Sequence, residues 1–334
     1  MQGLLNSNHG REVGIRHLTK AFQRRAIPAD AVESRWTAPD GHAIRRIDWP
    51  APASPARGSL LFMPGRGEAY EKYLETFEHW RRQGWRVSAA DWRGQAGSGR
   101  LGSDAVTGHV DDFSLWVDDL AAFWREWASG RAEPLVLASH SMGAHLALRA
   151  IAERRLDPAP AAMLMSAPML DVLPEALPLL LRQGTAGLMC AVRDPRRPAW
   201  KWSERPGEVP AFRQSLLTHD ADRYADELWW REHRPELVMG PGSWGWVRTA
   251  LASIKALARP GVLESIDVPI HIVATSADRL VGVAAIRKAA RRLPKAETLW
   301  FGPEAAHEIW READPVRDRA LAAADAFLDG VCPR

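Results

Sequence analysis

Short apolar runs alternate with longer amphipathic segments over most of this chain. A parallel sheet covered by helices on both faces has this pattern, because its strands are buried on both sides and are joined by crossover helices. The predicted strands are 60–63, 87–90, 135–138, 161–165, 270–274 and 297–300, and the predicted helices are 70–83, 111–128, 144–153, 283–293 and 315–328. The sequence therefore predicts an α/β fold built on a mostly parallel sheet.

Two stretches depart from this alternation. Asp40-Gly41 separates residues 34–38 from 43–49 and predicts a hairpin turn, because Asp-Gly readily adopts the positive φ angles of tight turns. Residues 167–257 hold six of the sixteen tryptophans, many prolines and no convincing run of buried strands. We expect a helical cap at 167–257, inserted into an α/β core of 31–166 and 258–334, with an N-terminal lead-in at 1–30.

Composition narrows the class of protein. The chain has 334 residues, 46% of them apolar, and can bury a large core, while a net charge of +3 does not require a nucleic-acid partner. Prolines and charges interrupt the richest apolar stretch, 173–192, and residues 1–30 carry charges throughout, so we expect no membrane span and a cytoplasmic location. Cys190 and Cys332 fit no disulfide or metal-site pattern.

The strongest local signal is a predicted strand that runs into Ser139-His-Ser-Met-Gly143 and then into a predicted helix. This order is typical of a nucleophile elbow, in which a sharp strand-to-helix turn lifts a serine hydroxyl out of the sheet. Small residues at positions 139 and 143 let the backbone pass without clashes, although position 139 is serine where glycine is usual. Ser141 is the predicted nucleophile.

A serine hydroxyl needs a positioned base, and the base needs an orienting acid. In this kind of fold the order along the chain is Ser, Asp, His, each in a loop after a strand. Asp278 follows the predicted strand at 270–274, and His307 follows the one at 297–300. We expect His307 to act as general base and Asp278 to orient it.

Other histidines and acids fit these roles less well. His140 and His145 flank the elbow too closely in sequence to reach back to Ser141, and His271 alternates within an apolar strand. Chain order argues against His219 and His233 in the cap, and Asp267 precedes its strand and so lies at the wrong edge of the sheet. Asp314 begins the last helix, where an acidic side chain stabilises the helix N-terminus.

Acyl transfer also needs hydrogen-bond donors directed at the developing oxyanion, each worth about 3 kcal/mol. Gly65 and Gly67 follow an early predicted strand, and glycines leave backbone N–H groups free to face a site. We assign the oxyanion hole to the backbone N–H groups of Arg66 and Met142. The alternative is that the two glycines only shape a loop.

Taken together, these segments resemble the α/β-hydrolases of the bacterial lysophospholipase and monoacylglycerol-lipase group, also called serine aminopeptidase-like hydrolases. The resemblance covers about 40–166 and 262–328 but not the cap, and Pro64 stands where many members have histidine. Its matched segments are 64–73, 91–100, 108–113, 139–143, 276–281 and 306–308. It implies the α/β-hydrolase fold with an inserted helical cap, and it carries Ser141, Asp278 and His307 over as a catalytic triad.

The resemblance further implies two-step acyl transfer through an acyl-enzyme, with no metal and no organic cofactor. It suggests a lysophospholipid or monoacylglycerol substrate, an apolar channel in the cap, and peripheral contact with the inner membrane. Trp200 and Trp202 are candidate substrate-binding residues, with cap packing as the alternative. Phosphate headgroups would meet the interleaved cap residues Arg193, Arg196, Arg197 and Lys201, which are otherwise a solvated face.

Two other functions stay open. One is an aminopeptidase-type amide hydrolase on the same fold, which needs free acidic groups in the cap for a substrate ammonium. The available acids are Glu204, Glu208, Asp220, Asp222, Asp226 and Glu227. The other is a ligand-binding protein without activity, which an intact triad argues against. The oligomeric state cannot be read from the sequence.

Overall fold

A single eight-stranded sheet organises the computed structural model, which describes residues 22–174, 177–201 and 211–333. The strand order is β1-β2-β4-β3-β5-β6-β7-β8, with β2 antiparallel to both neighbours and the remaining pairs parallel. The strands are β1 (Val32–Thr37), β2 (Ala43–Trp49), β3 (Gly58–Met63), β4 (Trp85–Ala90), β5 (Leu135–His140), β6 (Ala162–Ser166), β7 (Ile270–Thr275) and β8 (Ala296–Phe301). The predicted α/β fold with a mostly parallel sheet is therefore confirmed.

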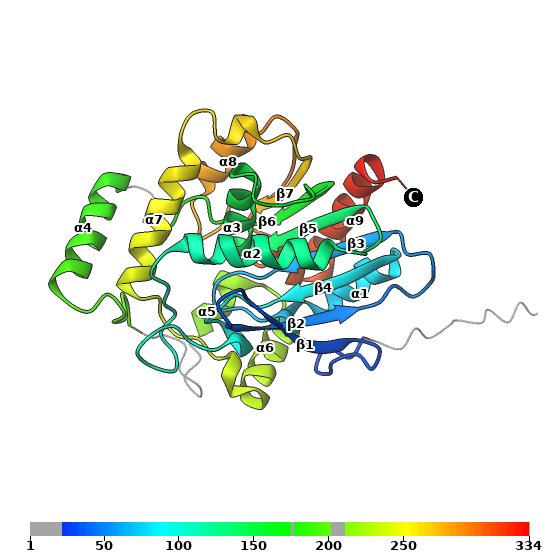
Figure 1. The fold of residues 1–334 in the computed structure, drawn as a ribbon, viewed down its shortest axis with the longest axis horizontal. Helices are drawn as coiled ribbons and strands as arrows, with labels where there is room; N and C mark the ends of the chain where they lie inside the picture. The colour runs from blue at the N-terminus through cyan, green and yellow to red at the C-terminus, as the bar shows by residue number, and fades with distance from the viewer. Residues whose placement is uncertain (1–21, 175–176, 202–210, 334) are drawn as a thin grey trace, which may run out of the picture.

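Helices cover both faces of this sheet (Figure 1). On one face lie α2 (Phe113–Ala128), α3 (Ser141–Ala152) and α8 (Val283–Arg292). On the other lie α1 (Leu74–Arg82) and α9 (Asp314–Val331). Strand residues alternate between the two faces: Leu61 and Met63 pack with α2 and α3, whereas Leu60 and Phe62 pack with α1 and α9.

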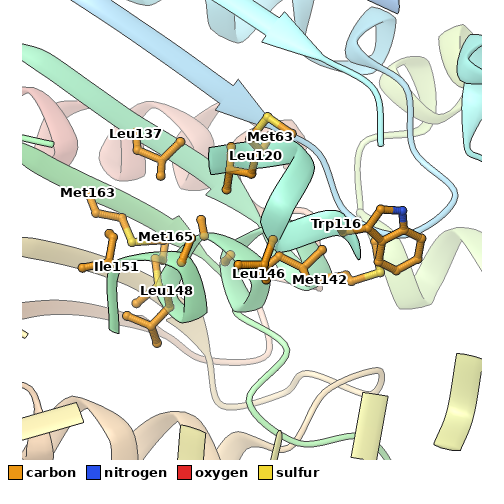
Figure 2. Close-up of a cluster of buried hydrophobic side chains, with 14 of the residues drawn as sticks. Met63, Trp116, Leu120, Leu137, Met142, Leu146, Leu148, Ile151, Met163 and Met165 are labelled. Carbon is orange, nitrogen blue, oxygen red and sulfur yellow. The ribbon is translucent and has the colours of Figure 1, made fainter. Parts of the chain in front are cut away.

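Bulky apolar side chains fill the layer between the sheet and helices α2 and α3. Figure 2 shows this layer, in which Leu146 and Met142 of α3 lie beside Trp116 of α2. Met142 and Leu146 are completely buried. Burial of apolar side chains stabilises the fold by roughly 1.5–3 kcal/mol each, so this layer fixes the start of α3 relative to the sheet.

The segment between β6 and β7 contributes no strand to the sheet where the structure describes it. Its helices are α4 (Leu179–Val192), α5 (Ala211–Leu217), α6 (Ala221–His233) and α7 (Trp244–Ala258). Helices α4 and α7 lie side by side at one end of the molecule (Figure 1). The expected cap boundary at 257/258 falls in the last turn of α7, whose Trp246, Ala250 and Leu257 belong to the same apolar core as α2 and α3. The division into core and cap stays a prediction.

The antiparallel start of the fold follows the predicted hairpin. Thr37 pairs with Ala43 across the turn, and Gly41 has a φ of 89°, which favours glycine. Most of the lead-in at 1–30 lies outside the described residues. From residue 22 onward it packs against the body: the Trp230 indole of α6 donates to the Arg24 carbonyl at 2.9 Å. Among the described residues no helix is both long and apolar enough to cross a membrane.

Candidate active site

Ser141 lies at the junction of β5 and α3 and has a φ of 51°. Side chains other than glycine rarely adopt this conformation, so the turn is strained and is maintained by its surroundings. Two positions away, a Cβ on Gly143 would lie 2.3 Å from the Pro64 carbonyl oxygen, so only glycine fits there. At position 139 the serine side chain is buried against β6, with its hydroxyl 3.5 Å from the Leu164 carbonyl. A serine is therefore accommodated where glycine is usual.

The loops that follow β7 and β8 bring Asp278 and His307 to Ser141. His307 Nε2 lies 2.9 Å from Ser141 Oγ, and His307 Nδ1 lies 2.7 Å from Asp278 Oδ2. The other oxygen of Asp278 accepts backbone N–H groups of Leu280 at 2.8 Å and Val281 at 3.1 Å. The three predicted residues thus meet at one edge of the sheet because β5, β7 and β8 are parallel and end there.

This arrangement shifts two pKa values in opposite directions. Burial alone would raise the pKa of Asp278, but the nearby charge of His307 and the hydrogen bonds from His307, Leu280 and Val281 lower it below its ordinary value. Burial alone would lower the pKa of His307, but the charge and hydrogen bond of Asp278 raise it above its ordinary value. An ionised Asp278 therefore stabilises the imidazolium that forms when His307 accepts a proton.

The residues assigned to the oxyanion hole lie on two neighbouring segments. Arg66 lies in the loop after β3, and Met142 is the second residue of α3. A Cβ on Gly143 would lie only 2.3 Å from the Pro64 carbonyl oxygen, so this loop packs directly on the start of α3. The first N–H groups of a helix have no acceptor within the helix, so the Met142 N–H is available to a ligand.

A cavity of about 660 Å³ opens over Ser141 and His307. Part of its wall is apolar, formed by Met169, Val172, Leu173, Pro174, Trp244, Trp246, Val247, Ala250, Leu280 and Val281. Another part is polar and charged, formed by Arg66, Glu68, Lys72, Arg213, Glu227, Arg279 and Glu308. The cavity therefore suits a molecule with an apolar portion and a polar portion.

Of the two tryptophans expected at the substrate site, Trp200 lines the cavity. Its ring stacks on the guanidinium of Arg66, 5.1 Å from centroid to Cζ, and its exposed fraction is 45%. Trp202 lies outside the described residues. No cluster of three or more side chains suited to a metal ion occurs in the part of the chain that the structure describes.

The histidines considered as alternatives to His307 have other contacts. His145 Nε2 lies 2.7 Å from Ser253 Oγ, and His271 is buried in β7. Burial and Arg149 lower the pKa of His145 to about 3, and burial lowers that of His271 to about 4. Both therefore stay neutral in the interior. In the segment after β6, His219 contacts Glu312 and His233 contacts the Trp229 carbonyl.

The alternative acids also have other contacts. Asp267 forms an exposed ion pair with Lys295 at the opposite end of β7, and Asp314 pairs with Arg223 at the start of α9. Neither contacts His307.

Sequence reasoning missed a buried group of charges beside His307. Lys72 Nζ lies 2.5 Å from Glu308, 3.0 Å from Glu227 and 3.3 Å from Glu68. Arg311 pairs with Glu308 and, at 3.2 Å, with Glu227. The available signal was the pair of charges at positions 68 and 72, four residues apart just after a buried strand.

Comparison with known families agrees with this geometry. A family model described as Serine aminopeptidase, S33, matches residues 54–314, which is most of the chain. The chain belongs to the serine aminopeptidase S33 family. The predicted resemblance to α/β-hydrolases of the lysophospholipase and monoacylglycerol-lipase group is thereby confirmed.

Two relatives from bacteria are similar to this chain in sequence. Lysophospholipase L2 of Escherichia coli K12 is 33% identical over 205 residues, which cover 60% of this chain and 59% of that protein. A probable lysophospholipase L2 of Haemophilus influenzae is 26% identical and is matched over 83% of this chain and 86% of its own length. The chain thus spans less than two thirds of the E. coli relative that it matches. These relatives support the prediction of a serine ester hydrolase.

Solved structures match the S33 chain in fold. A soluble variant of monoglyceride lipase from Saccharomyces cerevisiae, in complex with a substrate analogue, has a TM-score of 0.72 at 19% identity. It covers 93% of this chain and 98% of its own. A carboxyl esterase from Bacillus coagulans in complex with glycerol has a TM-score of 0.70 at 15% identity, with 91% and 100% covered. At such identities the likeness shows the fold, which is the predicted α/β-hydrolase fold.

Proposed function

We propose that this protein hydrolyses carboxylic esters by a Ser-His-Asp mechanism, with Ser141 as nucleophile, His307 as general base and Asp278 as orienting acid. The observation that carries the proposal is the chain of hydrogen bonds from Ser141 Oγ to His307 Nε2, at 2.9 Å, and from His307 Nδ1 to Asp278 Oδ2, at 2.7 Å. Both distances are within hydrogen-bond reach, and Ser141 faces a cavity large enough for a substrate.

The proposed reaction has two acyl-transfer steps. His307 takes the proton of Ser141 as its oxygen attacks the ester carbonyl, and the backbone N–H groups of Arg66 and Met142 stabilise the resulting oxyanion. His307 then returns the proton to the departing alcohol, which leaves an acyl group on Ser141. Water activated by His307 releases this acyl group. Every proton transferred in these steps passes through His307, so the proposed reaction uses no metal or organic cofactor.

The mixed apolar and charged lining of the cavity supports a single-chain lipid as substrate. Apolar residues such as Leu173, Val172 and Val281 suit an acyl chain, and the charged residues suit a hydroxylated or phosphorylated headgroup. A lysophospholipid or a monoacylglycerol has both portions. The names of the E. coli and H. influenzae relatives favour the first of these.

We further propose that helix α4 contacts a membrane surface. Of its fourteen residues only Ala186 is buried, and Leu180, Leu181, Leu188 and Val192 are each more than half exposed. Single exposed leucines are ordinary, but a helix that exposes several resembles an interfacial helix. Exposed cations at positions 193 and 201 lie beyond its C-terminal end and would meet anionic headgroups, as would Arg196, which pairs with Asp194. Leu173 and Pro174, just before α4, line the cavity, so its mouth would open toward the membrane.

The aminopeptidase alternative is weakened by the partners of the acids in the segment after β6. Asp226 pairs with Arg24 and Arg25, and Asp220 caps α6 through Arg223. Glu227 lines the cavity but already contacts Lys72 and Arg311, so it is not free for a substrate ammonium. Glu204 and Glu208 lie outside the described residues.

Hydrolysis of p-nitrophenyl esters with acyl chains from two to sixteen carbons tests the function. Wild-type activity should rise with chain length, and Ser141→Ala should lower turnover on the order of 10⁶-fold. Ser166→Ala is the matched control, because this buried hydroxyl on β6 has no hydrogen-bond partner among the described residues. No hydrolysis of any ester by the wild type, together with cleavage of peptide amides, would reject the esterase in favour of the amide hydrolase. Failure to react with a fluorophosphonate would reject both.

A further inference from the structure

His140, the residue before Ser141, has an acceptor at each ring nitrogen. Its Nδ1 lies 2.9 Å from Glu68 Oε2, and its Nε2 lies 3.2 Å from the backbone carbonyl oxygen of His307. A carboxylate and a carbonyl can only accept, so both contacts are hydrogen bonds only if both nitrogens carry a proton. The ring of His140 thus links the buried Glu68 carboxylate to the backbone of His307.

Glu68 in turn holds the loop that carries Arg66. Its Oε2 accepts the Gly65 N–H at 2.5 Å, and the Tyr73 hydroxyl donates to the same carboxylate at 3.0 Å. A Cβ on Gly65 would come within 2.8 Å of Glu68 Oε2 and 3.0 Å of His140 Nδ1. The absence of a side chain at position 65 therefore makes room for the Glu68–His140 pair.

The Glu68–His140 pair thus joins three segments that are distant in sequence. One is the loop after β3, the second is the end of β5 where Ser141 follows, and the third is the loop of His307 after β8. The rings of His140 and His307 lie 4.7 Å apart between centroids. Glu68 is 6% exposed and His140 is 1% exposed, so solvent screens their charges little.

We propose that Glu68 and His140 form a positioning pair for the reaction, which rests on the function proposed above for Ser141. His140 fixes the backbone of His307, and so the position of Nε2 relative to Ser141 Oγ. Glu68 fixes the backbone at Gly65, and so the direction of the neighbouring Arg66 N–H. The pair therefore aligns the base and the oxyanion donor with the same nucleophile, although neither side chain takes part in bond making.

The partners of Glu68 keep its buried carboxylate ionised. Burial alone would raise the pKa of Glu68, but the charges of His140 and Lys72 and the hydrogen bonds from His140 and Gly65 lower it well below its ordinary value. A buried carboxylate with these partners stays ionised, and removing one partner would leave the other as an uncompensated buried charge. Replacing either residue therefore disturbs both loops.

Kinetics of Glu68→Gln, His140→Gln and the double variant test this role. Small displacements of reacting groups cost about 10²-fold in rate, so we expect kcat on a p-nitrophenyl ester to fall by about 10- to 100-fold with KM nearly unchanged. Inhibition by an alkyl trifluoromethyl ketone, which forms a tetrahedral adduct on the serine, should weaken by the same factor. Because the two residues act as a unit, the double variant should lose little more than either single variant.

His145→Gln is the matched control, since this buried histidine near the elbow contacts Ser253 and not His307. If Glu68→Gln fails to fold, Glu68→Asp takes its place. Unchanged kcat in folded variants would overturn the positioning role, as would a loss of kcat without weaker ketone inhibition. Wild-type protein that neither hydrolyses esters nor reacts with fluorophosphonate would instead reject the proposed function itself.

Discussion

Asp278→Asn should nearly abolish ester hydrolysis while leaving the fold intact. The two backbone N–H groups of Leu280 and Val281 donate to Asp278 Oδ1, at 2.8 and 3.1 Å, so an asparagine must place its carbonyl oxygen there. Its amide nitrogen then takes the position of Oδ2, 2.7 Å from His307 Nδ1, and donates a hydrogen bond to it. His307 is thereby held with its proton on Nε2, facing Ser141, and cannot accept the serine proton.

The expected loss in kcat is about 10⁴-fold, or about 5.4 kcal/mol of transition-state stabilisation. Turnover of p-nitrophenyl butyrate near neutral pH measures it, with thermal unfolding as a check on the fold. Asp267→Asn is the matched control, because this acid lies at the other end of β7 and its side chain is 90% exposed. A folded Asp278→Asn variant that kept more than about a tenth of wild-type kcat would refute the argument that the backbone donors fix the amide, and with it the role of Asp278.

Three further predictions concern the elbow, the base and the surface. Gly143→Ala should abolish activity and lower the melting temperature, because its Cβ would lie 2.3 Å from the Pro64 carbonyl; a stable, active variant would contradict this. The value of kcat/KM should rise with pH as His307 loses its proton, with a midpoint above the ordinary histidine pKa of 6.5. The reason is that the charge and hydrogen bond of Asp278 raise the pKa of His307 more than burial lowers it. A midpoint below 6.5 would refute the assignment of His307 as the base. Leu180→Glu should weaken binding to anionic vesicles without changing hydrolysis of a soluble ester, whereas the same change at Val32, which is also exposed but lies on β1, should alter neither. Equal effects of the two variants would reject docking by α4.

The positions of Ser141, Asp278 and His307 could be predicted because they depend on local order and on one topological rule. Each follows an apolar run, and parallel strands end at the same edge of a sheet. The strand and helix ranges followed from periodicity within a few residues. The helix expected from 144 begins at Ser141, where the N-cap residue His140 makes no side-chain capping hydrogen bond.

The partners of these residues could not be predicted in the same way. The contact between Glu68 and His140 joins side chains 72 positions apart, and no periodic pattern encodes such a distance. Its position next to Ser141 sets His140 aside as a base, and nothing in the sequence indicates its contact with the loop of His307. Likewise the sequence assigns a role to the backbone N–H of Arg66 but not to its guanidinium, which lies over the rings of both Trp200 and Trp246.

The segment after β6 contacts the loop of His307 directly, through backbone hydrogen bonds and buried charges. The backbone N–H groups of His307 and Glu308 donate to the carbonyls of Leu216 and Leu217, at 3.3 and 2.8 Å, at the end of α5. Glu227 of α6 shares the buried charges beside His307. Because these contacts are made by the backbone of His307 and by charges beside it, we infer that displacement of α5 or α6 would change the geometry of His307. Helix α4 instead packs on α7, and its Arg182 pairs with Asp171, so a displacement of α4 would leave the contacts at His307 in place.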